Sequence, residues 1–294
     1  MRYGALEAGG TKMVMGILNE RMEIIRSTAC ATRAPEETMK DILSFFEGEQ
    51  LDAMGIATFG PVNLDKNSED YGSITSTPKL AWRNYPLYKA IKDALNVPTL
   101  VDTDVNAAAL AEATMGAAKG LENILYVTVG TGIGGGLLVG GRLVHGMLHP
   151  EWGHIPLSRS KDDPLQRGIC PYHALCLEGL ASGPSIQARW GMPAKDIPED
   201  HMAWDLESYY LAQLCITALM TVSVERIVLG GGVMHQEVLF PKIRAQFKEM
   251  LGDYLQHPMI ERLDELIVPP ALYPNSGLVG AGLLAKNALQ QKEQ

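Results

Sequence analysis

The pattern of apolar and polar positions predicts two successive series of short strands and helices. Three apolar runs come first, and a helix beginning at Pro35 follows, since proline suits a first turn and apolar residues then recur at helical spacing. The first series runs strand, strand, strand, helix, strand, helix, strand, helix. Its strands are predicted at residues 2–8, 12–18, 23–29, 51–60 and 97–104, and its helices at 35–46, 86–95 and 106–118.

The second series repeats the design of the first. The segment VTVGTGIGGGLLVGG (127–141) matches ALEAGGTKMVMGIL (5–18) as a strand, a Gly/Thr turn and another apolar strand, which indicates an internal duplication. We predict an N-terminal lobe at residues 1–118 and a C-terminal lobe at 119–277, with the last helix, about 278–294, packing back on the first lobe. The second series has predicted strands at 123–129, 137–144, 225–233 and 265–273, and helices at 182–192, 203–221, 240–255 and 278–289.

Composition narrows the range of partners. The chain has 294 residues and a formal net charge of −9. This charge argues against a protein that binds nucleic acid or anionic membranes, because both need basic patches. No apolar run is long enough for a transmembrane helix, and the N-terminus lacks the apolar stretch of a secretory signal. We therefore expect a cytoplasmic protein with no nucleic-acid or membrane partner.

Glycine turns that follow apolar strands are the first candidates for chemistry. They lie at residues 9–10, 130–136 and 230–232. The second contains G-x-G-x-x-G, but that dinucleotide pattern needs a helix after the glycines, and an apolar strand is predicted here instead. A turn without side chains lets backbone N–H groups approach an anion closely. The repeated turns therefore predict a site for nucleotide phosphates.

Two carboxylates end the strand predicted at 97–104. Asp104 stands just before a helix, where it suits a helix N-cap, but the carboxyl end of a strand is also the common position for a ligand-binding residue in α/β sheets. Both interpretations remain open from the residues alone. Asp102 competes for the same role, since it could share a face with Asp104.

A histidine- and cysteine-rich stretch predicts a metal site. Cys170, His173 and Cys176 have ligand spacing for zinc, and His154 is the preferred upstream ligand, with His149 or His145 as alternatives. Four protein ligands would make the site closed and structural. Glu151 and Glu178 bracket the stretch and are candidates for holding hydroxyl groups. The remaining cysteines, Cys30 and Cys215, are isolated and are expected to be reduced thiols.

These segments together resemble the motifs of the ROK family of repressors, open reading frames and sugar kinases. The resemblance covers essentially the whole chain. It implies a two-lobed actin-like ATPase fold of the ribonuclease H-like class, with duplicated α/β domains of βββαβαβα order and a zinc-binding loop. The segments that carry it are Glu7–Lys12, Thr103–Ala108, residues 127–136, His149–His154 with Cys170–Glu178, and Gly230–Val233.

The resemblance also implies a role for each motif residue. Asp104 would be the base that accepts the proton of the sugar's C6 hydroxyl as it attacks the γ-phosphorus of ATP. The sugar would be bound by Thr103, Asp104, Glu151, Glu178 and Gly60. ATP, with Mg²⁺, would be bound by Gly9, Gly10, Thr11, Lys12, Thr131, Gly132, Pro184, Gly231, Gly232 and Val233. Structural Zn²⁺ would be held by His154, Cys170, His173 and Cys176, and a homodimer is the family expectation.

Within the family, the closest resemblance is to the zinc-containing fructokinases of bacteria. Glu7 stands where many glucokinases have Asp, Thr103 stands where they place an Asn, and TPKLAW (77–82) is similar to the fructokinase branch. The expected activity is ATP-dependent phosphorylation of fructose, with a kinase for mannose, glucose or an N-acetylhexosamine as the alternative. A sugar-responsive regulator is disfavoured, because the first motif begins at Glu7 with no DNA-binding domain before it. A sugar-binding protein without catalytic activity is also disfavoured, because the candidate base Asp104 and the phosphate turns are present.

Overall fold

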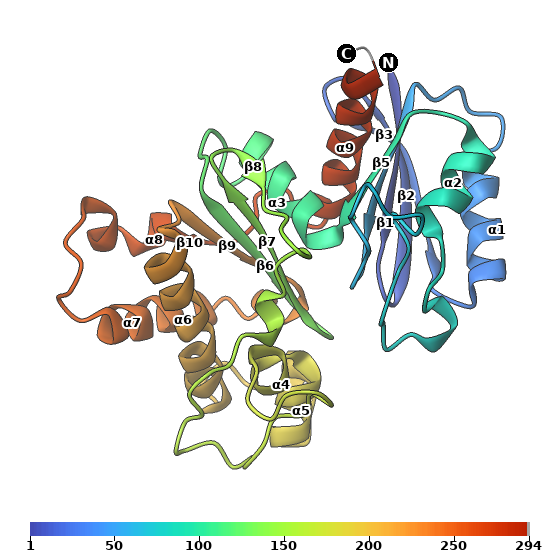
Figure 1. Ribbon diagram of the computed structural model, residues 1–294. Helices are drawn as coiled ribbons and strands as arrows, with labels where there is room; N and C mark the ends of the chain where they lie inside the picture. Colours follow the sequence, from blue (N-terminus) through green and yellow to red (C-terminus); the bar gives the residue numbers. More distant parts are fainter. Residues whose placement is uncertain (293–294) are drawn as a thin grey trace. The chain divides into compact units, whose positions relative to one another are not determined.

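Two five-stranded sheets organise the chain, and the computed structural model describes residues 1–292 around them (Figure 1). Contacts between residues divide the chain into two compact units. Unit 1 contains residues 1–111, 145–149 and the C-terminal part from Leu272 onward. Unit 2 contains residues 112–144 and 150–271.

The sheet of unit 1 has β1 (Arg2–Ala8) at its centre. The strand order is β3-β2-β1-β4-β5. β1 pairs antiparallel with β2 (Lys12–Asn19), which pairs antiparallel with β3 (Ile24–Ala31). On its other edge β1 pairs parallel with β4 (Ala53–Thr58), and β4 pairs parallel with β5 (Thr99–Thr103).

The sheet of unit 2 repeats this topology strand for strand. Its order is β10-β9-β6-β7-β8, with β6 (Ile124–Val129) in the position of β1. β6 pairs antiparallel with β7 (Ile133–Val139) and parallel with β9 (Arg226–Gly230). β8 (Arg142–Leu143) and β10 (Ile267–Val268) form the edges. The predicted duplication of an α/β fold is therefore confirmed.

Residue size along β4 decides which helices cover each face of the first sheet. Met54 and Ile56 point to one face and pack with α1 (Pro35–Phe46) and α2 (Leu87–Leu95). Ala53 and Ala57 point to the other face, where α9 (Ser276–Lys292) and α3 (Asp104–Met115) contribute to the core. Large side chains thus pack with α1 and α2, and small ones admit the small-residue helix α9. Figure 1 shows α1 and α2 on one side of this sheet and α9 on the other.

Gly55 allows the backbone of α9 to lie against β4. A Cβ atom at this position would lie 1.8 Å from the carbonyl oxygen of Ala281 and 2.7 Å from the backbone nitrogen of Ala285. We expect Gly55→Ala to lower the free energy of unfolding by about 1–3 kcal/mol or more, because the helix must move away from the sheet. Urea unfolding measures the change. Gly146→Ala is the control, since a Cβ there meets only the oxygen of Leu148 at 4.0 Å, and an equal loss in both variants would contradict the packing argument.

The helices of unit 2 surround a single apolar cluster. α6 (Ala203–Val222) is the longest of them and contributes buried residues such as Trp204, Tyr210 and Leu211. The other helices are α4 (Leu177–Ala181), α5 (Gly183–Trp190), α7 (Leu239–Leu251) and α8 (Leu263–Leu266). Among the described residues, no helix has both the length and the apolar character needed to cross a membrane.

Several element boundaries differ from the predicted ones for physical reasons. β7 begins at Ile133, inside the glycine run, because its antiparallel ladder with β6 starts at the pair Val129 and Ile133. Gly135 within this strand leaves room for Trp152, since a Cβ would lie 2.8 Å from that side chain. The strand predicted at 265–273 is reduced to β10, since Pro269 and Pro270 lack the N–H that a ladder needs. The short helix α4 was not predicted.

A buried ion pair holds the long loop that precedes α4. Arg189 Nε and Nη2 contact the carboxylate of Asp163 at 2.9 and 3.0 Å, and the hydroxyl of Tyr210 donates to the same carboxylate at 2.6 Å. Both charged side chains are almost fully buried. Burial raises the pKa of Asp163, but the hydrogen bonds from Arg189 and Tyr210 lower it more, so the pKa lies below its usual value.

We expect Asp163→Asn to lower the free energy of unfolding by about 3–5 kcal/mol, because Arg189 keeps its buried charge without a carboxylate partner. The pKa of Asp163 is depressed in the folded state, so its stabilisation is present above the unfolded pKa of about 3.9 and is lost as the pH falls through the folded pKa. The difference in the free energy of unfolding between wild type and variant, measured with urea, should therefore shrink below about pH 4.

The control for this prediction is Asp93→Asn, in the exposed pair with Lys89. This substitution should change the free energy of unfolding little at any pH. A pH-independent difference at Asp163 would contradict the electrostatic explanation.

Candidate functional site

The catalytic segment proposed from the sequence lies at the junction of β5 and α3. Asp104 is the first residue of α3 and is partly exposed, and its Oδ1 accepts from the N–H of Val105 at 2.9 Å. The hydroxyl of Thr103 accepts from the N–H of Asn106 at 3.1 Å, so Thr103 fills the capping role. The interpretation of Asp104 as an N-cap is therefore wrong, because Thr103 precedes the helix and Asp104 is its first residue.

Asp102, the competitor for the catalytic role, is buried and serves as an anchor. Its Oδ1 accepts from the N–H of Thr103 and from Nδ2 of Asn106, both at 2.7 Å. Its Oδ2 lies 2.9 Å from Nε2 of His145. Several protein groups thus occupy this carboxylate, which leaves Asp104 as the more accessible of the two.

The first glycine turn joins β1 to β2. The N–H of Gly9 donates to the oxygen of Lys12 at 3.0 Å, and a Cβ on Gly9 would lie 2.7 Å from that oxygen, so the tight turn requires glycine. Thr32 secures the turn through its N–H to Thr11 O at 3.0 Å and its hydroxyl to Gly9 O at 2.7 Å. Gly10, Thr11 and Lys12 therefore sit on a fixed backbone.

Glu7 precedes this turn and faces the start of α9. A Cβ on Gly277 would lie 2.5 Å from Cδ of Glu7, so the carboxyl group packs directly against the first turn of the helix. Burial raises the pKa of Glu7, while the charge of Lys12 and a hydrogen bond from the backbone of Leu278 oppose the rise. The side chain of Glu7, which is longer than that of an Asp, thus links the phosphate turn to α9.

Gly60 lies at the end of β4, in a segment that His149 supports. The Gly60–Pro61 peptide bond is cis, and the N–H of Val62 donates to Nε2 of His149 at 3.3 Å. Cε1 of the same ring lies 3.4 Å from the position of a Cβ on Gly60. The backbone around this predicted sugar residue is therefore packed against the imidazole.

The predicted nucleotide residues of unit 2 come together around the β6–β7 turn. Gly130 donates to the oxygen of Gly132 at 2.9 Å and accepts from the N–H of Gly183, next to Pro184 at the start of α5, at 2.8 Å. Gly231 has φ of 92°, and a Cβ there would lie 2.5 Å from the nitrogen of Val129. The methyl Cγ2 of Val233 lies 3.7 Å from the position of a Cβ on Gly183. The turn carrying Thr131, the start of α5 and the short helix Gly232–His235 thus converge.

Glu178 lies at this turn as well as beside the metal ligands. Its Oε2 accepts from the N–H of Ile133 at 3.0 Å and lies 2.8 Å from the position of a Cβ on Gly132. Its Oε1 lies 4.0 Å from Nε2 of His154. Burial, followed by repulsion from Glu178, raises the pKa of Glu151. The two predicted sugar-binding carboxylates therefore share one electrostatic environment, and the contact of Glu178 with the turn was not predicted.

The four predicted zinc ligands form a cluster in unit 2. The ligand atoms of His154, Cys170, His173 and Cys176 all lie within 4.8 Å of one another. Sγ of Cys170 lies 3.9 Å from Nδ1 of His154 and 3.8 Å from Nδ1 of His173. Two thiols and two imidazoles are a ligand set that suits a tetrahedral zinc ion.

The local fold explains how these ligands meet. His154 ends the short helix Trp152–His154, and Cys176 caps α4, where its Sγ accepts from the N–H of Gly179 at 3.4 Å. Backbone hydrogen bonds join the two segments, from Leu157 N to Leu175 O and from Leu177 N to Ile155 O. The alternative ligands His145 and His149 contact Asp102 and Val62 instead, and neither belongs to the cluster.

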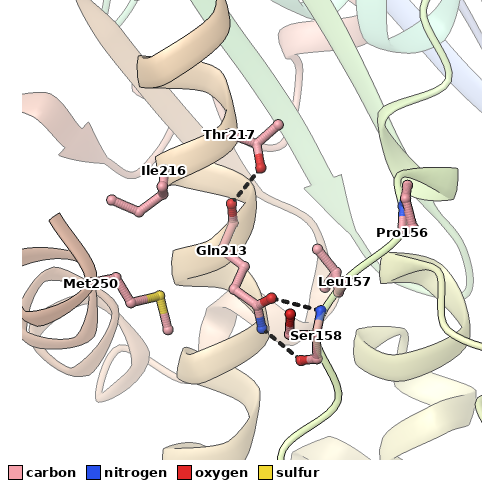
Figure 2. A pocket seen from close by; sticks show the side chains of 7 residues that line it. All are labelled: Pro156, Leu157, Ser158, Gln213, Ile216, Thr217 and Met250. Carbon is pink, nitrogen blue, oxygen red and sulfur yellow. Dashed lines mark hydrogen bonds between the residues drawn. The ribbon is translucent and has the colours of Figure 1, made fainter.

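A cavity of about 410 Å³ lies elsewhere in unit 2, beside α6 and the segment that follows His154 (Figure 2). Gln213 from α6 reaches the backbone of Ser158: Oε1 accepts from the Ser158 N–H at 2.9 Å, and Nε2 donates to the Ser158 oxygen at 3.0 Å. Ile216 and Met250 add apolar walls. The amide of Gln213 is thus committed to fixing the loop.

Comparison with known proteins identifies the family. The model of the ROK family matches residues 3–288. A fructokinase of Lactococcus lactis subsp. cremoris is 43% identical, over 87% of this chain and 87% of that protein. A fructokinase of Pediococcus pentosaceus is 40% identical, over 99% of both chains. Among solved structures, the ROK hexokinase from Thermus thermophilus is similar with a TM-score of 0.78 and 24% identity, over 100% of both chains. The chain belongs to the ROK family.

Proposed function

We propose that this protein is an ATP-dependent hexose kinase that converts D-fructose and ATP to D-fructose 6-phosphate and ADP. The observation that carries the proposal is the identity of 40–43% to fructokinases of two bacteria. The placement of Asp104 at a strand end, with its side chain partly exposed, adds support from the structure. A kinase for mannose, glucose or an N-acetylhexosamine is the alternative.

Asp104 acts in this proposal as the base. It accepts the proton of the C6 hydroxyl while the hydroxyl oxygen bonds to the γ-phosphorus and the bond to the β-phosphate oxygen of ATP breaks. A carboxylate in this position orients the hydroxyl and takes the proton late, which suits a loose phosphoryl transition state.

ATP would be bound in this proposal at the glycine turns. Gly9, Gly10, Thr11 and Lys12, at the turn between β1 and β2, would contact phosphates. Thr131 and Gly132, at the turn between β6 and β7, would also contact phosphates, and Pro184, Gly231, Gly232 and Val233 would hold the adenosine. Glycine suits these positions because backbone N–H groups can approach an anion closely. A bound Mg²⁺ ion would neutralise charge on the transferring phosphates.

In this proposal the sugar would be held by Thr103, Gly60, Glu151 and Glu178. Carboxylates suit this task because they accept paired O–H donors. The hydrogen bond from Ile133 N to Glu178 fixes the orientation of that carboxylate. Glu178 would thus connect the sugar-binding residues to the phosphate turn.

The metal in this proposal is structural zinc. Four protein ligands leave no open coordination position, so the ion would fix the loop that carries Glu151 and Glu178. His154 would bind through Nδ1, while its Nε2 faces Glu178.

We also propose that the chain forms lobes at residues 1–118 and 119–277 and that the protein is cytoplasmic. The proposed oligomeric state is a homodimer, and size-exclusion chromatography with light scattering tests it.

A coupled assay of ADP release tests the proposed activity. Purified protein with ATP and Mg²⁺ should release ADP only when hexose is added, and fructose should give the highest rate. ADP release that is independent of sugar would indicate a different ATPase, and a higher rate with another hexose would favour the alternative substrate.

A further inference from the structure

A short segment of the chain packs with unit 1 although its neighbours on both sides belong to unit 2. This segment, the histidine strap, is His145–His149. Val144, just before it, still continues the second sheet through a hydrogen bond to Leu137 O at 3.0 Å. Beyond the strap the chain leads through Pro150 to Glu151, so the strap separates two stretches of unit 2.

The strap is held at its two ends, and its middle is exposed. Met147 is 94% exposed and Leu148 is 54% exposed. His149 is buried, and His145 contacts a buried carboxylate. A strap held by packing would bury its apolar residues, so the histidine side chains are its main attachment to unit 1.

Each histidine contacts a segment that carries a residue of the proposed site. Nε2 of His145 lies 2.9 Å from Oδ2 of Asp102, whose Oδ1 holds the N–H of Thr103 and the amide of Asn106. This carboxylate therefore fixes the turn that presents Asp104. A buried carboxylate must have its hydrogen bonds made, so losing the imidazole donor would allow the turn to shift.

The second histidine supports the other segment. Nε2 of His149 accepts from the N–H of Val62 at 3.3 Å, and its ring packs against Gly60. An acceptor at Nε2 places the proton of the neutral ring on Nδ1, whereas His145 presents Nε2–H to Asp102. The two rings thus use the same atom in opposite roles, one as acceptor and one as donor.

We propose that His145 and His149 are positioning residues of the kinase: His145 orients the catalytic segment through Asp102, and His149 orients the sugar segment at Gly60. This inference rests on the proposed function for its kinetic consequences. Misplacement of a reacting group by about 1 Å can cost a hundredfold in rate, so modest shifts in these segments are enough to matter.

The test uses amide side chains of two lengths. Gln reaches the position of Nε2 and can donate or accept there, whereas Asn has the same amide but is too short. We expect His145→Asn to lower kcat about tenfold with little change in KM for the sugar, and His145→Gln to restore most of the rate. His149→Asn should mainly raise KM for the sugar, and His149→Gln should restore it. Met147→Ala, on the same strap, should behave as wild type.

A second readout is independent of activity. Amide hydrogen exchange at Val62, measured in the ligand-free protein, should be faster in His149→Asn and close to wild type in His149→Gln. The proposal would be overturned if kcat were unchanged in His145→Asn or if Val62 exchange were unchanged in His149→Asn. It would also be overturned if Met147→Ala had effects as large as those of the histidine variants. If the wild-type protein phosphorylates no hexose, the proposed function fails, while the Val62 exchange still decides whether His149 holds its segment.

Discussion

Asp104→Asn is expected to lower kcat by about a hundredfold or more and to change KM for the sugar and for ATP only modestly. The amide keeps the shape of the side chain and its contact with the N–H of Val105 but cannot accept the proton of the attacking hydroxyl. Binding of the substrates therefore survives while the chemical step slows. Steady-state kinetics with fructose and ATP measure the effect.

Asp102→Asn is the informative comparison for this prediction. Asp102 is buried and its carboxylate is engaged by Thr103, Asn106 and His145. Its substitution should lower stability as well as rate, whereas Asp104→Asn should leave the unfolding midpoint near that of wild type. A near-normal kcat in Asp104→Asn, or a rate loss that merely follows lost stability, would remove Asp104 from the role of base.

Cys176→Ser is expected to abolish stoichiometric zinc and to lower the unfolding temperature by about 10 °C or more. Thiolate ligands dominate the affinity of such a site, and the binding energy of a structural metal contributes directly to folding. A loss of only a few kcal/mol already shifts the midpoint by this amount, at roughly 2–4 °C per kcal/mol. Elemental analysis after dialysis and a thermal scan provide the two readouts.

The isolated cysteines supply the control for the metal prediction. Cys30 is partly exposed and lies outside the cluster. Cys30→Ser should therefore keep both the metal and the unfolding temperature. Chelator treatment of the wild-type protein should reproduce the stability loss of Cys176→Ser, and addition of zinc should reverse it. Wild-type protein that contains no zinc after dialysis, or a variant that retains it, would contradict the assignment.

Local patterns were sufficient to predict most of the fold. Proline and acidic residues at the start of α1, followed by helical spacing of apolar residues, predicted Pro35–Phe46, and the structure has the same helix. The matching glycine turns after β1 and β6 predicted the duplication, because the same chain reversal must join the paired strands. Boundaries were missed where pairing with another strand decides them, as with β7, which starts within the glycine run at the residue that pairs with Val129.

The candidate site shows a similar limit. Spacing predicted the cysteine and histidine ligands because they are close in sequence, and the structure gathers those residues. The sequence favoured His154 as the upstream ligand, and the cluster contains it. Only the tertiary contacts of His145 and His149 remove these two residues as alternatives, since all three have the same side chain. The contact between Glu178 and Ile133 joins two distant segments and had no sequence signal. Asp104 as an N-cap was wrong because the hydroxyl of Thr103 does that work.

The most direct test of the proposed fructokinase activity is a comparison of kcat/KM for fructose, mannose, glucose and N-acetylmannosamine with ATP, with the phosphorylated carbon of each product identified by NMR. We expect turnover that depends on ATP and Mg²⁺, the highest kcat/KM for fructose, and phosphate at the C6 oxygen. Absence of turnover with every hexose, or phosphorylation at another oxygen, would contradict it.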